Sequence, residues 1–428
     1  MSPVLPFDII SLVIDIVGEN KDTNLLKELA LVSHSFLQIS SKHLFATVEL
    51  GGIPGLPAYR VASKKGFVKL LQSRPDVVKY IRKLTYNLGY DRMADISPES
   101  FKLQSSNFND DDNLLSPILP NFLRTISHLN CLTITTTGAV LDWTKLNSSL
   151  TSAFLHLMYL PTINHIALSC LHNFPLSSLT PSVNLHRLDI FKLSSFTPRK
   201  EDSSPEIDVQ LEMMPKIRDL RILWSSRLTA KLLLAKTQDG RPAFNIMDLR
   251  RLSISSDLRK DEQNIRYLLQ NAKLLENFNL SVGHRQTIVG LHDILSPSPR
   301  NLKVLGLILV LVYDRFVPRL LAELCKELEA MAGHNMLEAL SFEVSINIIS
   351  PEPEDFIGSM IQKLEEVLLV KPGWSALREV SLKVIIPHGR DGERLFADKY
   401  VIGQLSSSSK SESVAFNYSV CFFGPLTM

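Results

Sequence analysis

The sequence predicts an α/β fold in which parallel strands line the inside of an elongated repeat array and helices lie outside. Three observations predict it: an apolar pattern that recurs ten times, helical periodicity between the copies, and three short amphipathic segments at the start of the chain. Each copy reads aliphatic, two variable residues, apolar, one variable residue, apolar. Such a stack of units makes a surface for holding another molecule rather than a catalytic pocket.

The ten copies define the expected strands. Their second and third anchors are two residues apart, so both side chains point to the same face of a strand. Successive first anchors lie 22 to 48 residues apart, which makes the array irregular. The copies are Ile81-Leu84-Tyr86, Leu129-Leu132-Ile134, Ile163-Ile166-Leu168, Leu185-Leu188-Ile190, Ile217-Leu220-Ile222, Leu249-Leu252-Ile254, Leu275-Phe278-Leu280, Leu302-Leu305-Leu307, Leu337-Leu340-Phe342 and Leu377-Val380-Leu382.

The segments between the strands have helical periodicity. Residues 265, 268, 269 and 272 are apolar at helical spacing, and a second run from Leu320 to Met331 is closed by Gly333. A doubly wound parallel sheet also alternates strand and helix, so it is the competing fold. Ten similar strand patterns and the absence of a glycine-rich phosphate loop favour the repeat array.

Four regions follow from these patterns. Residues 1–50 form a helical domain, 51–78 a helical linker, 79–403 the array, and 404–428 a tail or cap. Three polar stretches, residues 91–113, 198–208 and 404–413, are expected to be solvated loops because they carry too few apolar residues to bury.

Composition narrows the class of function. The chain of 428 residues has 46 basic and 44 acidic residues, a net charge of +2, which lacks the basic excess typical of nucleic-acid binding. The longest apolar stretch, Val304 to Tyr313, is about half of what a membrane span needs. The N-terminal residues lack the pattern of a secretory signal. We therefore expect a cytoplasmic or nuclear protein that binds neither nucleic acid nor membrane.

No catalytic, cofactor or metal motif is found in the sequence. There is no Gly-x-Ser-x-Gly, phosphate loop, His-Glu-x-x-His or Cys-x-x-Cys. The four cysteines are far apart, and Cys131 is interpreted as a packing or surface residue. His156, His165 and His172 are nine and seven residues apart, which places them on neither one strand face nor one helix turn. We expect no enzyme, no cofactor and no bound metal.

Three short helices are predicted in the first fifty residues. Leu5-Pro6 opens the first, which Gly18 is suited to end. Asp22, Thr23 and Asn24 are cap candidates for the second helix, and Ser33 is one for the third. The run Leu5-Pro6-x-Asp8-Ile9-Ile10, then Ile14, Leu29-x-Leu31-Val32-Ser33-x-x-Phe36 and Leu44-Phe45, resembles an F-box.

The F-box resemblance implies that this domain docks onto the Skp-family adaptor of a cullin-RING ubiquitin ligase. The alternative is a three-helix cap that only seals the end of the array. The adaptor contacts that the resemblance implies are Leu5, Pro6, Ile9, Ile10, Ile14, Val32, Ser33 and Phe36.

The array resembles the leucine-rich repeat family in an irregular form, although most copies lack the asparagine that regular members place after the strand. The residues between the anchors should face away from the core and could hold a protein target. Arginine beside an aromatic residue is typical of binding hot spots, while alternating charges can also simply pair with each other. The candidate target-binding residues are Arg187, Asp189, Phe191, Asp219, Arg221 and Arg251.

Taken together, these resemblances predict a substrate-receptor subunit of an SCF-type ubiquitin ligase. The helical domain would bind the adaptor, and the repeats would bind a target protein. The alternative is a repeat scaffold for protein interactions with no ligase attached.

Overall fold

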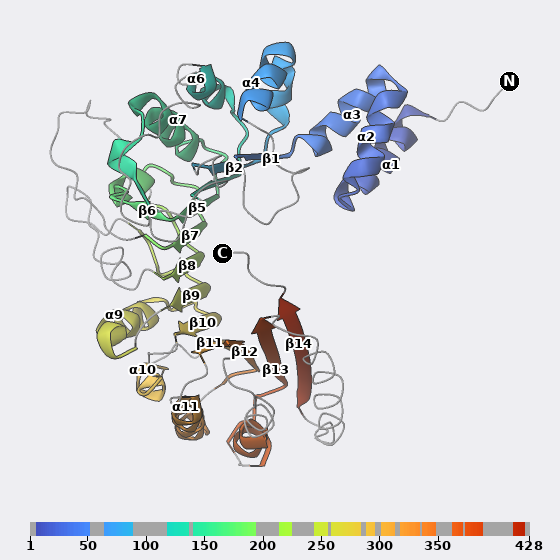
Figure 1. Cartoon of the computed structure of the whole chain (residues 1–428). Coiled ribbons are helices and arrows are strands. Elements are labelled where there is room, and N and C mark those ends of the chain that lie inside the picture. Colours follow the sequence, from blue (N-terminus) through green and yellow to red (C-terminus); the bar gives the residue numbers. More distant parts are fainter. Residues whose placement is uncertain are drawn as a thin grey trace. The chain divides into compact units, whose positions relative to one another are not determined.

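The computed structural model describes fourteen stretches of the chain, and the molecule divides into two compact units, residues 1–215 (unit 1) and 216–428 (unit 2). Both units are α/β (Figure 1). The division falls inside the region that the sequence predicted as one array. The described residues are 6–51, 64–88, 118–136, 140–193, 214–224, 244–255, 258–283, 288–295, 301–312, 317–333, 336–347, 362–370, 373–387 and 414–423.

Unit 1 begins with the three predicted helices, α1 (Phe7–Glu19), α2 (Thr23–Val32) and α3 (His34–Leu44), here called the N-terminal module. The predicted caps of α2 and α3 are confirmed. The Asp22 carboxylate accepts a hydrogen bond from the backbone N–H of Leu25, and the Ser33 hydroxyl accepts one from that of Phe36. These caps satisfy backbone donors that the first turn of a helix leaves unpaired.

Gly18 has a different role from the one predicted. Helix α1 continues through it to Glu19, so Gly18 does not end the helix. A Cβ at this position would overlap the imidazole of His43 on α3. That ring is fixed by a 2.6 Å contact between Nε2 and the Asp15 carboxylate, which Lys42 also approaches at 2.6 Å. Hydrogen bonds from Lys42 and then His43 lower the pKa of Asp15. Gly18 therefore permits the close approach of α1 and α3.

The main sheet of unit 1 is parallel, and its strands follow one another in chain order. Helices lie between successive strands along the chain. A separate two-stranded ladder joins β4 (Leu141–Asp142) to β6 (Leu171–His172). The main strands are β1 (Thr47–Leu50), β2 (Lys83–Asn87), β3 (Cys131–Thr135), β5 (His165–Ser169) and β7 (Arg187–Phe191). The helical segments are α4 (Lys64–Ser73), η2 (Pro75–Tyr80), α6 (Ile118–Thr125), η4 (Trp143–Lys145), α7 (Ser148–Met158) and η5 (Leu176–Leu179).

Unit 2 repeats the same arrangement with longer strands. Its strands are also parallel and in chain order, with α9, α10 and α11 stacked along one side (Figure 1). The strands are β8 (Asp219–Leu223), β9 (Arg251–Ser255), β10 (Asn277–Val282), β11 (Val304–Val312), β12 (Ala339–Asn347), β13 (Glu379–Pro387) and β14 (Ala415–Phe423). The helical segments are α9 (Leu258–Asn271), α10 (Leu291–Leu295), α11 (Val317–Met331) and the π-helical turn η6 (Glu366–Val370).

The ten predicted strands are confirmed, and all thirty of their anchor residues are buried. In unit 1, Leu84, Leu132, Ile166 and Leu188 occupy one register position on successive strands. In unit 2, the corresponding row runs from Leu220 through Phe278 to Phe416. Four further strands, β1, β4, β6 and β14, were not predicted. In the main sheets, β1 has the aromatic Phe45 and β14 has Ser413 where the triplet requires an aliphatic first anchor. The predicted polar loops 91–113, 198–208 and 404–413 lie outside the described residues.

The connection into each strand is also repeated. One backbone carbonyl accepts hydrogen bonds from two consecutive N–H groups at the equivalent position of the next repeat. In unit 1, the Asn130 carbonyl accepts from Asn164 and His165 at 3.0 and 3.1 Å. In unit 2, the Glu276 carbonyl accepts from Lys303 and Val304 at 2.8 and 3.0 Å. The hydrogen bonds at the start of each of these strands are therefore the same, and the irregular spacing in the sequence reflects connecting segments of different length.

Candidate interaction surfaces

The N-terminal module carries two apolar stripes on α1. Ile10, Ile14 and Val17 recur at helical spacing and pack inward, where Ile14 forms a small core with Leu26 and Ile39. The second stripe, offset around the helix axis, is exposed to solvent. Contiguous exposed apolar surfaces are uncommon on folded domains and are a known feature of interaction sites. The exposed apolar residues of the module are Phe7, Ile9, Leu12, Val13, Ile16, Leu25, Leu31 and Val32.

The predicted adaptor contacts separate into exposed and buried residues. Ile9 and Val32 are exposed by 48% and 65%, and Pro6 is exposed at the start of α1. Ile14 is 1% exposed and belongs to the core of the module, against which Ile10 and Phe36 pack. Ser33 is the N-cap of α3, and Leu5 lies outside the described residues. Ile9 and Val32 are thus available at the surface, whereas Ile14 supports the fold of the module.

The face of the unit 1 sheet opposite the anchors carries a cluster of ionisable groups. His165 on β5 lies opposite Cys131 on β3 and Arg187 on β7. The Cys131 sulfur is 3.1 Å from Nδ1 of His165, and Nε2 of His165 is 3.0 Å from the Asp189 carboxylate. Arg187 donates to the same carboxylate from Nε and Nη2 at 2.9 to 3.2 Å. The small side chain of Ala167 opposite Asp189 leaves room for the diagonal contact with His165.

The cluster holds charge at neutral pH. Burial lowers the pKa of His165, but hydrogen bonds with Asp189 and Cys131 outweigh it and raise the pKa to about 9. Burial raises the pKa of Asp189, and its hydrogen bonds with His165 and Arg187 more than compensate and lower it below the ordinary value. We conclude that the imidazolium donates from both nitrogens, to the sulfur and to the carboxylate.

The remaining candidate target-binding residues are divided between the two units. Phe191 is partly exposed at the end of β7, and the Lys192 ammonium lies 5.8 Å from its ring centroid. In unit 2, Asp219 and Arg251 lie directly opposite on β8 and β9, with 3.4 Å between Nε and the carboxylate. Arg221 is exposed and has no ion-pair partner among the described residues.

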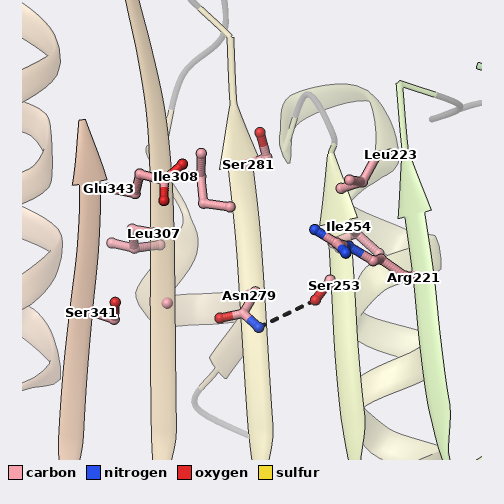
Figure 2. A pocket seen from close by; sticks show the side chains of 11 residues that line it. Arg221, Leu223, Ser253, Ile254, Asn279, Ser281, Leu307, Ile308, Ser341 and Glu343 are labelled. Carbon is pink, nitrogen blue, oxygen red and sulfur yellow. Dashed lines mark hydrogen bonds between the residues drawn. The ribbon is translucent and has the colours of Figure 1, made fainter. Parts of the chain in front are cut away.

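Arg221 borders a hollow of about 180 Å³ on the unit 2 sheet (Figure 2). The hollow exists because small residues occupy one register row: Ser253, Asn279, Gly306 and Ser341 on β9 to β12. Asn279 donates a hydrogen bond from Nδ2 to the Ser253 hydroxyl at 3.2 Å (Figure 2). At the far side, Glu343 is paired with Lys383 at 3.0 Å. Organic cofactors usually occupy larger pockets, so the hollow suits one or two side chains of a protein.

Sequence reasoning missed two features of these faces. Cys131 and His165 are 34 residues apart, so their contact depends on the register of β3 against β5. Both occupy the same position in their triplets, immediately before the second anchor, and this shared position was the available signal. Trp224, which follows β8 and is 54% exposed, was also not predicted to be accessible.

No group of three or more potential metal ligands is found among the residues that the structure describes. Within the same residues, no helix has the length and hydropathy needed to cross a membrane. No protein-family model matches the chain, and no curated protein matches it. Proposals about function therefore rest on the sequence patterns and on the geometry of these surfaces.

Proposed function

We propose that this chain is the substrate-receptor subunit of an SCF-type cullin-RING ubiquitin ligase. In this proposal, the N-terminal module is an F-box that docks onto a Skp-family adaptor, and the repeats hold a protein target. The observation that carries the proposal is the second apolar stripe of α1. A helical cap needs one apolar face to cover the end of an array, but α1 has a further one directed to solvent.

The repeats are proposed to form an irregular leucine-rich-repeat solenoid. Support comes from the one-strand-per-repeat order within each unit, without the reversal of strand order that defines a doubly wound sheet. The repeated carbonyl that receives two N–H groups at each strand entry also supports it. Such arrays present the sheet face opposite the core to partners.

The role of the chain in catalysis is positional. A receptor brings the target close to a ubiquitin carrier, and proximity converts a slow encounter into an effectively intramolecular step. On the unit 2 face, Arg221 beside the hollow would receive an acidic group of the target, while the Ser253 and Ser341 hydroxyls would hydrogen-bond to its backbone. Glu343 is already paired with Lys383 and adds little net charge.

The adaptor part is tested by binding of the full chain to a purified Skp-family adaptor. Replacing Ile9 and Val13 together by glutamate should weaken binding at least roughly 30-fold, because buried apolar anchors each contribute about 1–2 kcal/mol or more. The matched control is Met247→Glu, which changes a residue of similar exposure in unit 2. No binding by the intact chain, or equal binding by the double variant, would overturn the proposal and leave the scaffold alternative.

The target part is tested separately by replacing Arg187, Arg221 and Arg251 and comparing the set of captured proteins with that of the intact chain. The variant should keep adaptor binding and lose specific partners. An unchanged partner set from a folded variant would remove both the unit 1 and the unit 2 sheet faces from the proposal.

A further inference from the structure

The contact between Cys131 and His165 joins three elements of a reactive thiol site: a nucleophile, an imidazolium and a carboxylate that orients the imidazolium. The sulfur lies 3.1 Å from Nδ1, and Nε2 lies 3.0 Å from Asp189. Arg187 donates to the same carboxylate oxygen from Nη2 at 2.9 Å and to the other oxygen from Nε at 3.2 Å, which fixes the position of the carboxylate. This order of contacts matches the general geometry of an activated nucleophile.

The surroundings of the sulfur favour its anionic form. Lys83 on β2 occupies the register position opposite Cys131, so cationic residues flank the thiol on both neighbouring strands. The charged groups on the described strands around it are Lys83 on β2, His165 on β5, Arg187 with Asp189 on β7, and Glu49 on β1, which lies in the same register row as Asp189. Nearby cations stabilise a thiolate relative to a thiol.

The site is also open to small reagents. Cys131 is partly exposed, and the side chains of His165 and Asp189 are exposed by 22% and 20%. The other cysteines whose side chains are described differ from it. Cys325 is buried, and Cys170 is partly exposed but has no hydrogen-bonded histidine among the described residues. Cys170 therefore serves as an internal reference of similar exposure.

We propose that Cys131 is a modification site whose thiolate reacts with peroxides. The sulfur attacks one peroxide oxygen, an S–O bond forms, and the O–O bond breaks. The sulfur loses two electrons and becomes a sulfenic acid, while the peroxide is reduced. The departing hydroxide takes the proton from Nδ1 of His165 and leaves as water, so His165 ends neutral. This step does not depend on the proposed ligase function.

The rate advantage can be estimated from thiolate content. An ordinary cysteine thiol is only about 3% ionised at pH 7, and a mostly ionised thiol gains up to roughly 30-fold. A stabilised thiolate is intrinsically less nucleophilic, so the increase in reaction rate is smaller than roughly 30-fold. We expect Cys131 to react roughly tenfold faster than Cys170 at pH 7.

The experiment uses the full chain and hydrogen peroxide, with a sulfenic-acid trap and mass spectrometry to quantify the Cys131 and Cys170 peptides. Alkylation by iodoacetamide from pH 6 to 9 gives a second, independent reaction rate for each of the two cysteines. Cys131 should react about tenfold faster than Cys170 at pH 7 with both reagents. Equal rates for the two cysteines in the intact chain would overturn the proposal without any variant.

His165→Asn removes the cation while retaining a polar side chain, and it should slow Cys131 roughly tenfold without changing Cys170. Asp189→Asn tests the positioning carboxylate and should have a smaller effect in the same direction. His156→Asn changes an exposed histidine of α7 and is the matched control. If His165→Asn folds and Cys131 keeps its full rate, the assigned role of the imidazolium is wrong.

Discussion

The exposed sheet faces of unit 1 and unit 2 are built on the same backbone pattern but differ in where their charged residues lie, clustered around a thiol in unit 1 and at the edges of a hollow in unit 2. In unit 1, the residues beside the anchors form a charged network of His165, Asp189 and Arg187 around a thiol. In unit 2, the central row is Ser253, Asn279, Gly306 and Ser341, which are uncharged and leave a hollow. The comparison teaches that the anchors determine the scaffold, while the variable positions between them determine what each face can bind.

The largest expected effect tests whether the two cores are equivalent. Leu188→Ala in unit 1 and Leu252→Ala in unit 2 each remove a fully buried anchor. Each should lower the free energy of unfolding by about 2–5 kcal/mol, because the lost apolar contact leaves a cavity. Denaturant unfolding measures both, and a negligible loss for either variant would contradict the shared scaffold.

The second prediction concerns pH and unit 1. Folding raises the pKa of His165 from 6.5 to about 9, so it stabilises the protonated form. That stabilisation is fully present below about pH 6.5 and is lost as the pH rises to about 9. We expect a decrease of roughly 1–2 kcal/mol across this range, smaller than the full shift implies because the site is partly exposed to water.

His165→Asn should flatten this part of the pH profile. The lowered pKa of Asp189 acts at the other end, where its contribution is present above pH 3.8 and is lost as the pH falls further. Thermal unfolding at pH 6 and pH 9 measures the stability that the intact chain and the His165→Asn variant each lose between these two pH values. A variant that keeps the full alkaline loss would show that another group is responsible.

The third prediction compares two arginine–aspartate pairs. Arg187 holds the half-buried Asp189 through two nitrogens, whereas Arg251 approaches Asp219 at 3.4 Å from a largely exposed position. Arg187→Gln should destabilise unit 1 by about 1 kcal/mol and Arg251→Gln unit 2 by less than about 0.5 kcal/mol, since exposed pairs contribute little. Chemical denaturation of both variants tests this order, and the reverse order would contradict it.

The last prediction concerns the hollow of unit 2. A Cβ on Gly306 would overlap the Asn279 side-chain oxygen, so Gly306→Ala should rotate that amide away and break its bond to Ser253. The change in unfolding free energy should stay within about 1 kcal/mol, because the end of the Asn279 side chain can move. Target capture should fall at the same time. Unchanged capture would show that the hollow does not contact the target.

The positions of the ten strands could be predicted because their apolar spacing fits a strand with one buried face. Residues such as Leu305 and Leu307, two apart in each copy, must share a buried face. The N-caps Asp22 and Ser33 were predictable for a similar local reason, since their hydroxyl or carboxylate serves a backbone N–H three residues on. In contrast, β14 could not be found from the triplet, because Ser413 stands where the first apolar anchor would be, although Phe416, Tyr418 and Val420 alternate as in a strand.

The sequence by itself determined where ten of the strands lie, which of their residues are buried, and where two of the first three helices are capped. These features depend on residues only a few positions apart, because the regular geometry of a strand or helix fixes which side such residues face. Only the tertiary structure decided that Cys131 meets His165, that Asp189 reaches the same ring, that Gly306 opens a hollow, and that one stripe of α1 is exposed. Those contacts join residues tens of positions apart, and their existence depends on strand register and helix packing that no short segment encodes.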